Sequence, residues 1–221
     1  MDVNRSNRRN INSIHIIMTF IISLEGNIGS GKSTLLERIA AAQTQSSKRI
    51  HILKEPIEEW LQVKKGDKNI LELFYEDPKQ YAFEFQILVY MSLYNAIKKQ
   101  AAECDVLICE RSLDSNAHIF TEMLYDKGYI NESQLGVLRY MCDKYKIKTD
   151  YRVYLFCPFS ICYYRMKERA RKGEEGITLD YLNDLQTYHR NFFFKFPYDE
   201  KIDNIESDEP LQAFIDSLHN F

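Results

Sequence analysis

The stretch "GNIGSGKST", residues 26–34, decides the fold of this chain, because it matches the phosphate-loop pattern G-x-x-x-x-G-K-[ST] in its expected context. An apolar run at residues 15–24 precedes it and predicts a strand that is buried on both faces. A helix is predicted over residues 32–43. Glycines let consecutive backbone N–H groups point at phosphate oxygens, and a helix N-terminus adds partial positive charge. The stretch therefore predicts a nucleotide site between the first strand and the first helix.

Two side chains of this loop have specific chemistry. Lys32 can reach the terminal phosphates of ATP, and the Ser33 hydroxyl can bind Mg²⁺. We therefore expect ATP and Mg²⁺ as cofactors, with the cofactor-binding residues Gly26, Asn27, Ile28, Gly29, Ser30, Gly31, Lys32, Ser33 and Thr34. The structural alternative is a glycine-rich turn with an exposed lysine. The loop alone fits a motor protein, a GTPase or a kinase, but the chain lacks the guanine-reading pattern N-K-x-D, which favours a small-molecule kinase.

Alternation of strand and helix predicts the fold class. Further strand-like segments follow the first at residues 49–55, 105–110, 151–156 and 201–205, and helical segments separate them. This order is typical of an α/β protein whose parallel sheet is covered by helices on both faces.

One helix is marked clearly, from Pro78 to about residue 102. Asp77 is a good N-cap residue, proline fits the first turn, and Gln80 completes a capping-box pattern. Gln86, Val89 or Tyr90, and Leu93 recur at helical spacing and share one face. That face fits ordinary core, but a glutamine among apolar neighbours needs polar partners and indicates a binding surface.

Composition excludes several classes of protein. The chain has 221 residues, 45% of them hydrophobic, which predicts one core, and its net charge of -3 gives no basic excess for binding nucleic acid. No apolar run is long enough for a membrane helix. The five scattered cysteines predict reduced core thiols and a cytoplasmic protein. We expect a disordered polar tail at residues 1–13, whose arginines weakly favour a mitochondrial location, and a single domain at residues 14–221.

Two acids stand at predicted strand ends, where open α/β sheets bind their ligands. Glu55 ends the second strand and Glu110 ends the third, directly before Arg111. Glu55 is the candidate general base for an alcohol that attacks a γ-phosphate. Arg111 could hold that carboxylate or the transferring phosphoryl group, and Glu110 could hold the water shell of Mg²⁺.

The stretch "RMKERARKGEEG", residues 165–176, predicts a lid. Arg165 and Arg169 share a helix face, and Arg171 lies near glycines that permit movement. Such a run is more often a solvated basic face. Above a phosphate loop, however, mobile arginines can close over ATP and neutralise the charge that develops in the transition state.

Taken together, these motifs resemble the deoxynucleoside kinase family. The matching pieces are "EGNIGSGKST" (25–34), "EPIEEW" (55–60), "LELFYEDP" (71–78), "FEFQ" (83–86), "ERS" (110–112) and "RMKERARKGEEGITLDYL" (165–182), in the order of the family. The resemblance implies a three-layer P-loop kinase fold, with a five-stranded parallel sheet surrounded by helices. It also implies a homodimer that acts on small-molecule deoxynucleosides rather than on nucleic acid or a membrane.

The same resemblance implies roles for individual residues. Glu55 would be the base at the sugar 5′-hydroxyl, Gln86 would pair with the nucleobase edge, Phe120 would stack on it, and Tyr75 with Glu174 would hold the 3′-hydroxyl. The lid arginines Arg165, Arg169 and Arg171, together with Lys32, Glu55 and Arg111, would be the catalytic residues. The substrate-binding set would be Glu55, Trp60, Tyr75, Phe85, Gln86, Val89, Leu93, Arg111, Asn116, Phe120 and Glu174.

Three positions depart from the deoxycytidine-type members of the family. Those members carry an Arg and an Asp where this chain has Leu93 and Asn116, and Leu93 leaves room for the 5-methyl group of thymine. We therefore expect pyrimidines, with thymidine first. Asp114 stands where relatives often have an aromatic residue, and we expect it to change the floor of the acceptor pocket. Two rival functions remain: a deoxynucleoside monophosphate kinase on the same fold, and a non-catalytic accessory subunit.

Overall fold

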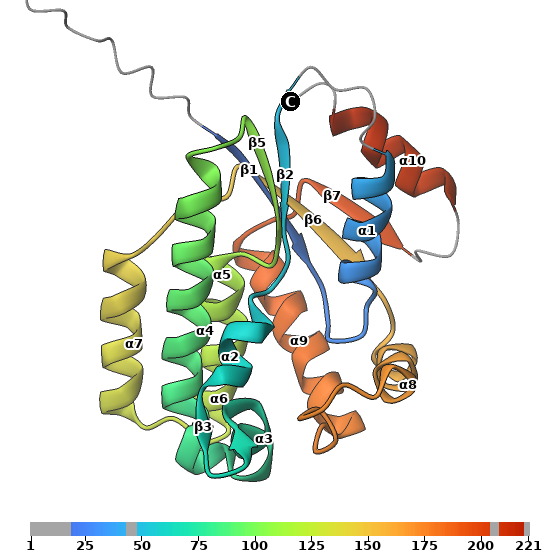
Figure 1. Cartoon of the computed structure of the whole chain (residues 1–221). Helices are drawn as coiled ribbons and strands as arrows, with labels where there is room; N and C mark the ends of the chain where they lie inside the picture. Colours follow the sequence, from blue (N-terminus) through green and yellow to red (C-terminus); the bar gives the residue numbers. More distant parts are fainter. Residues whose placement is uncertain (1–18, 43–47, 204–207, 219–221) are drawn as a thin grey trace, which may run out of the picture.

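The structure is a computed structural model that describes residues 19–42, 48–203 and 208–218 (Figure 1). Five parallel strands form one sheet in the order β2-β5-β1-β6-β7. They are β1 (Phe20–Glu25), β2 (Ile50–Leu53), β5 (Val106–Glu110), β6 (Tyr151–Phe156) and β7 (Glu200–Asp203). All five predicted strands are therefore confirmed. The predicted start of the first strand, residues 15–18, lies outside the described residues.

The central strand β1 separates two packing faces. Ile22 and Leu24 pack with Leu36 of helix α1 (Lys32–Ala42) and Phe214 of α10 (Asp208–Ser217) on one face. Ile21 packs with side chains of α4 (Pro78–Ala101) on the other face. Both faces are covered because β1 alternates its side chains between two apolar layers. Figure 1 shows α1 and α10 on one side of the sheet, with α4 and α9 on the other.

The remaining elements surround this sheet and carry the residues of the site. They are α2 (Ile57–Gln62), the hairpin of β3 (Lys64–Lys65) and β4 (Lys68–Asn69), α3 (Ile70–Glu76), α5 (Leu113–Ser115), the π-helix η1 (Asn116–Phe120), α6 (Thr121–Asp126), α7 (Glu132–Lys144), α8 (Phe159–Arg169) and α9 (Leu179–Lys195). A π-helix is rare, and such segments are frequent at functional sites.

Local sequence signals place α4 as predicted. Asp77 accepts a hydrogen bond from the Gln80 backbone amide at 3.2 Å, and Pro78 occupies the first turn. This is one half of the predicted capping box. Complete capping boxes occur at Asn69, before α3, and at Asn131, before α7, where the sequence analysis did not predict them. Asn69 fixes the start of α3, which carries Tyr75 toward the site.

Substitution of Gly29 can test how closely the phosphate loop packs against helix α8. Its φ is +78°, and a Cβ there would lie 2.3 Å from the Cys162 carbonyl oxygen at the start of α8. Gly128 is a matched control, because its φ is +69° and a Cβ would meet nothing within 4 Å. We expect Gly29→Ala to lower the free energy of unfolding by at least about 3 kcal/mol, from backbone strain plus a collision.

Gly128→Ala should lower it by only about 1 kcal/mol, the cost of strain alone. Urea denaturation of both variants measures the difference. Equal losses would contradict the close approach of α8 to the loop.

Candidate active site

Asn27 anchors the phosphate loop to helix α9. Its side-chain amide donates to the Leu182 carbonyl of α9 at 2.8 Å, and its Oδ1 accepts the Ile28 amide at 2.9 Å. The Asn27 carbonyl accepts from the Lys32 ammonium at 2.9 Å. Asn27 therefore orients the loop and its lysine, and its predicted contact with the nucleotide stays a prediction.

Lys32 is buried beside other charged groups. Burial is the main reason why its pKa falls to about 8, and Arg111 adds to the effect, while Glu110 and Glu55 oppose it. A polyphosphate in the loop would supply the negative charge that favours the ammonium form. Phosphate binding would therefore raise the pKa of Lys32 again.

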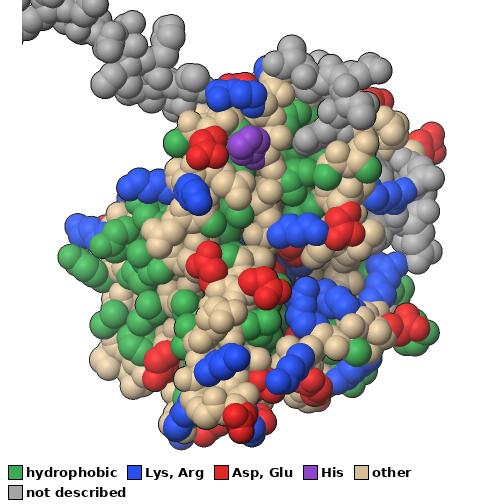
Figure 2. Space-filling model, viewed as in Figure 1, with side chains coloured by type: hydrophobic (Ala, Val, Ile, Leu, Met, Phe, Trp, Pro, Cys, Tyr) green, Lys and Arg blue, Asp and Glu red, His purple; other side chains and the backbone are tan. Residues whose placement is uncertain are grey.

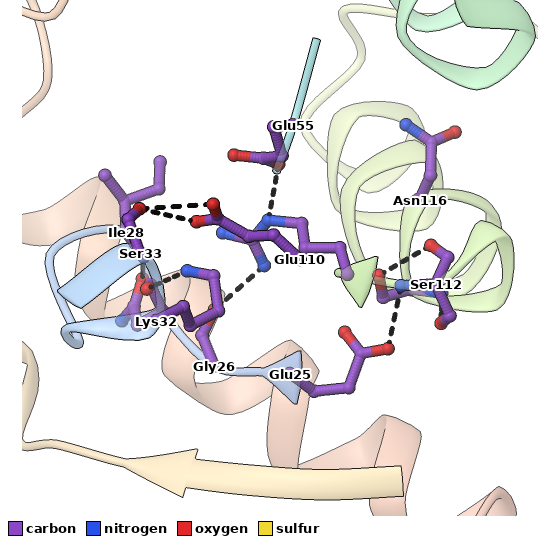
Figure 3. Close-up of polar contacts among 12 residues, drawn as sticks. Glu25, Gly26, Ile28, Lys32, Ser33, Glu55, Glu110, Ser112 and Asn116 are labelled. Atoms are coloured by element: carbon purple, nitrogen blue, oxygen red, sulfur yellow. Dashed lines mark hydrogen bonds and ion pairs between the residues drawn. The ribbon is translucent and has the colours of Figure 1, made fainter. Parts of the chain in front are cut away.

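Ser33 and Glu110 form the second polar contact of the loop. The Ser33 hydroxyl donates to the Glu110 carboxylate, with distances of 2.9 and 3.1 Å to its two oxygens (Figure 3). Glu110 is buried at the end of β5. Hydroxyl and carboxylate oxygens are hard ligands, and Mg²⁺ is commonly held by one or two such groups plus phosphates. The side-chain oxygens of Ser33 and Glu110 are therefore suitable ligands for the predicted Mg²⁺ ion.

Arg111 connects the acid Glu55 to the loop. Its Nε donates to Glu55 Oε1 at 2.9 Å, and its Nη1 donates to the Gly26 carbonyl at 2.8 Å (Figure 3). The backbone of Arg111 is left-handed, with φ at 71°, and its amide donates to the Leu24 carbonyl of β1 at 3.0 Å. A non-glycine residue in this region is strained, and such strain concentrates at functional sites.

Glu55 lies just after β2 ends at Leu53, so the prediction that it ends the strand was slightly wrong. Burial is the largest effect on its carboxyl group and raises its pKa above the ordinary glutamate value. Glu110 also raises this pKa, while Arg111 and Lys32 lower it. A carboxylate whose pKa is raised is a stronger proton acceptor.

One cavity of about 1050 Å³ joins the loop to these acids and extends between α2, α3 and α4. It is lined by every residue of the predicted substrate-binding set and by all three predicted lid arginines. Of the loop, Ile28, Gly29, Gly31, Lys32, Ser33 and Thr34 line it. Gly26, Asn27 and Ser30 do not line it. The face in Figure 2 shows basic and acidic side chains around this hollow.

The sequence analysis missed several lining residues. Among them are Leu71 and Phe74 of α3 and Tyr181 of α9. Phe74 stacks on Phe85 with ring centroids 4.8 Å apart, and Tyr181 meets Tyr75 edge-on at 6.0 Å. The pieces that resemble the family contained these residues, but neither spacing nor chemistry distinguished them from ordinary core.

At the end of the cavity away from the loop, buried amides meet. Gln86 Oε1 accepts from the Asn116 side-chain amide at 3.1 Å and from the Thr121 hydroxyl at 3.4 Å. The Gln86 Nε2 group and the Asn116 Oδ1 atom remain as a donor and an acceptor. Nearby, the Trp60 indole donates to the Ser92 hydroxyl at 2.8 Å, which fixes its ring in the wall.

Two arginines of the predicted lid pair with the same carboxylate, that of Glu174. Helix α8 ends at Arg169, and Ala170 is left-handed. Arg169 and Arg171 pair with the two oxygens of Glu174 at 2.7 and 3.1 Å, and the Glu174 side chain is 8% exposed. Two arginines that share a buried carboxylate hold the segment in place.

One prediction for the acceptor pocket was wrong. Asp114 does not line the cavity; it pairs instead with Arg152 of β6 at 2.6 Å. The sequence could not show this pair, because the two residues are far apart in the chain and meet only when the segment after β5 packs against the sheet.

Comparison with known proteins identifies the family. Residues 22–214 match the family model of the deoxynucleoside kinases. The chain belongs to the deoxynucleoside kinase family. As a member, this deoxynucleoside kinase is an enzyme that uses a nucleotide phosphate donor, which favours catalysis over the accessory-subunit alternative.

Individual relatives of this deoxynucleoside kinase differ in the nucleoside that they are named for. The chain is 34% identical over 179 residues to a probable deoxycytidine kinase of fowlpox virus, covering 77% of this chain and 70% of that protein. It is 30% identical over 203 residues to human mitochondrial thymidine kinase 2, covering 89% and 74%. The base preference therefore does not follow from the family.

A solved structure supports the fold of this deoxynucleoside kinase. Deoxyadenosine kinase from M. mycoides has a TM-score of 0.76 at 22% identity, covering 91% of this chain and 100% of that one. It confirms the predicted P-loop kinase fold with a five-stranded parallel sheet. In the part of the chain that the structure describes, no helix has the length and apolarity needed to span a membrane.

The lowered pKa of Lys32 predicts proton uptake when the Mg²⁺ complex of a nucleoside triphosphate binds. Near pH 8 about half of the free lysine is uncharged, and bound phosphates would restore its charge. Uptake should vanish about two pH units lower, where the lysine is already charged. Calorimetry in buffers of different ionisation enthalpy measures this uptake.

Lys32→Arg is the matched control, because arginine keeps its charge at every accessible pH. This variant should bind without uptake. Uptake of the same size in the variant would contradict the assignment to Lys32.

Proposed function

We propose that this deoxynucleoside kinase transfers the γ-phosphate of ATP to the 5′-hydroxyl of pyrimidine deoxyribonucleosides, with thymidine favoured. The observation that carries the proposal is the single cavity that contains Lys32 and Ser33 at one end and the Gln86 amide at the other. In Figure 3, Glu55 lies between the loop and Asn116. A nucleoside with its base at Gln86 would place its 5′-oxygen toward Glu55.

The proposed mechanism gives the base role to Glu55. Its carboxylate accepts the proton of the 5′-hydroxyl as that oxygen attacks the phosphorus atom. Arg111 holds Glu55 in place through Nε, and its fixed position near the loop stabilises charge on the transferring group. Lys32 and the lid residues Arg165, Arg169 and Arg171 supply further positive charge.

Ser33 and Glu110 would hold Mg²⁺ in this proposal, directly or through water. The bound ion would supply positive charge that neutralises the phosphate groups. The sequence position of Ser33, at the start of α1, supports this role, as does the burial of Glu110 beside it.

The base subsite supports a pyrimidine. Gln86 Nε2 and Asn116 Oδ1 offer one donor and one acceptor, which match the edge of thymine, while Val89 and Leu93 form an apolar wall. Phe120 would stack on the ring, with Trp60 and Phe85 completing the wall. Tyr75 and Glu174 would hold the 3′-hydroxyl at the sugar.

A deoxynucleoside monophosphate kinase is the alternative with the same fold. A phosphate on the acceptor needs cations near Glu55. The cavity wall there adds Glu58 and Glu59, which disfavour a second phosphate. We therefore favour the nucleoside as acceptor. Turnover of thymidine compared with its monophosphate tests this choice, and a preference for the monophosphate would contradict it.

The proposal includes the organisation of the protein. We propose one kinase domain over residues 14–221, with a lid near 165–176, that forms a homodimer in the cytoplasm. None of the five cysteines forms a disulfide, as expected in a reducing compartment. Val137 and Tyr140 of α7 are 52% and 68% exposed, which supports an apolar contact between copies. Light scattering of the purified protein measures the oligomeric state.

The raised pKa of Glu55 predicts the pH dependence of catalysis. The base must be deprotonated, so kcat/KM should fall as the pH drops through the raised pKa, above the range of an ordinary glutamate. Glu55→Gln should lower kcat by about 10²–10⁴-fold and remove this acidic limb. A pH–rate profile with thymidine and Mg-ATP measures both effects.

Glu84→Gln is the control, because Glu84 is exposed on α4 and does not line the cavity. Its profile should match that of the unaltered enzyme. Undiminished turnover of Glu55→Gln would reject the base role.

We expect nucleoside affinity to depend on the buried side-chain amide of Gln86. Gln86→Ala removes the acceptor for Asn116 and Thr121 and the donor to the base, so thymidine binding should weaken by about 1–3 kcal/mol. The exposed Gln80 on the same helix provides the control Gln80→Ala. Titration calorimetry gives both affinities. An unchanged affinity in Gln86→Ala would move the base subsite elsewhere.

A further inference from the structure

The helical segment after β5, residues 112–120, presents two different faces. Ser112, Asn116 and Phe120 line the cavity. Asp114 and His118 do not: Asp114 pairs with Arg152 at 2.6 Å, and the His118 ring stacks on Phe196 at 4.8 Å. The segment therefore holds the base subsite on one face and packs against β6 and α9 with the other.

The start of this segment is fixed to β1. The Ser112 amide donates to Glu25 Oε1 at 2.9 Å, and the preceding Arg111 amide donates to the Leu24 carbonyl at 3.0 Å. These bonds hold the point at which the segment begins. The rotation of the following turns decides where Asn116 and Phe120 point. It depends on how the buried side chains of the segment pack and on the contacts of the segment with β6.

The Asp114–Arg152 pair acts on that rotation. Arg152 extends from β6, where its backbone is in register with Ser23 of β1. Its side chain is 17% exposed and that of Asp114 is 30% exposed, so the bond is shielded more than a surface ion pair. The guanidinium also lies over the Phe196 ring, 6.0 Å from its centroid. A charge-assisted bond at 2.6 Å to a guanidinium held by a strand and a ring restrains Asp114 in direction as well as distance.

Among the described residues, Arg152 Nε is buried without a hydrogen-bond partner. Arg152 is thus incompletely satisfied even in the intact enzyme, and it depends on Asp114 for its strong bond. Loss of the Asp114 charge would let both the guanidinium and the segment relax to new positions. Asn116 is close enough in the same segment to move with Asp114, and its bond to Gln86 would then lengthen or break.

We propose that Asp114 and Arg152 are positioning residues that set nucleobase discrimination from outside the cavity. Their ion pair adds to the packing that sets the rotation of residues 112–120 and so contributes to placing Asn116 and Phe120 against the base. The inference rests on the proposed function, because it assigns the base to the subsite at Gln86. Neither residue lines the cavity, so their effect passes through the segment rather than through contact with substrate.

Asp114→Asn tests the pair, because it removes the charge and keeps the shape of the side chain. Glu122→Gln is the matched control. Glu122 lies in the next helix, α6, and pairs at 3.1 Å with Arg139 of α7, whose side chain is 62% exposed. We expect Asp114→Asn to weaken thymidine binding and raise its KM by about three- to tenfold, with the KM for ATP unchanged. The ratio of kcat/KM for thymidine over deoxycytidine should shift as well. Glu122→Gln should change none of these values.

Trp60, the sole tryptophan of the chain, lies in the cavity wall and reports nucleoside binding by fluorescence without turnover. Binding that weakens in Asp114→Asn and is unchanged in Glu122→Gln supports the positioning role. An enzyme that binds nucleosides in this pattern but does not phosphorylate them would overturn the proposed function and leave the inference standing.

Arg152→Gln and the double variant Asp114→Asn with Arg152→Gln complete the test. If the pair acts as one unit, the double variant shows the same loss of affinity and the same discrimination as each single variant. A role in stability alone would lower the melting temperature, with thymidine affinity and discrimination unchanged well below it. That outcome would overturn the proposal. A double variant whose loss of affinity equals the sum of the losses in the two single variants would overturn it as well.

Discussion

The Arg111 guanidinium bonds the Glu55 carboxylate through Nε and the Gly26 carbonyl through Nη1, and so joins the acid to the phosphate loop. The backbone of Arg111 is left-handed where these two bonds form. The guanidinium also lies over the Phe120 ring, 4.7 Å from its centroid. One side chain therefore contacts the donor loop, the acid and the aromatic wall of the acceptor cavity.

Burial of charge gives these groups their properties. Lys32 and Glu55 are buried close to Glu110 and Arg111, and these neighbours contribute to the pKa shifts of Lys32 and Glu55. Burial lowers the pKa of the lysine and raises the pKa of Glu55. The same low dielectric that destabilises the charged forms in the free enzyme would strengthen their interactions with phosphate and with the attacking hydroxyl. Burial of these charged groups therefore costs stability in the free enzyme and would strengthen their interactions during the reaction.

Base preference has a different physical origin from phosphoryl transfer. In the proposed function the residues around the loop and Glu55 act on the 5′-hydroxyl, which is common to all nucleosides, and the relatives are named for different nucleosides. The neutral amides of Gln86 and Asn116 supply hydrogen-bonding groups without charge, and their direction depends on how residues 112–120 are held. Small shifts in that segment would change which base is bound best, with the phosphate loop unaffected.

Resemblance to the family implied the substrate-binding residues, but not the lining residues Leu71, Phe74 and Tyr181. The sequence by itself determined the five strands, the phosphate loop and the long helix. These followed from local signals: periodicity, glycines at turns, N-caps, and motifs whose residues are neighbours in the chain. Only the tertiary structure decided that Asn27 anchors the loop to α9, that Arg169 and Arg171 share Glu174, and that Asp114 faces Arg152 rather than the cavity. The first and last of these contacts join residues far apart in the chain, and all three depend on the side to which a segment turns. The sequence did not show that side, because it is decided only when each segment packs against the rest of the protein.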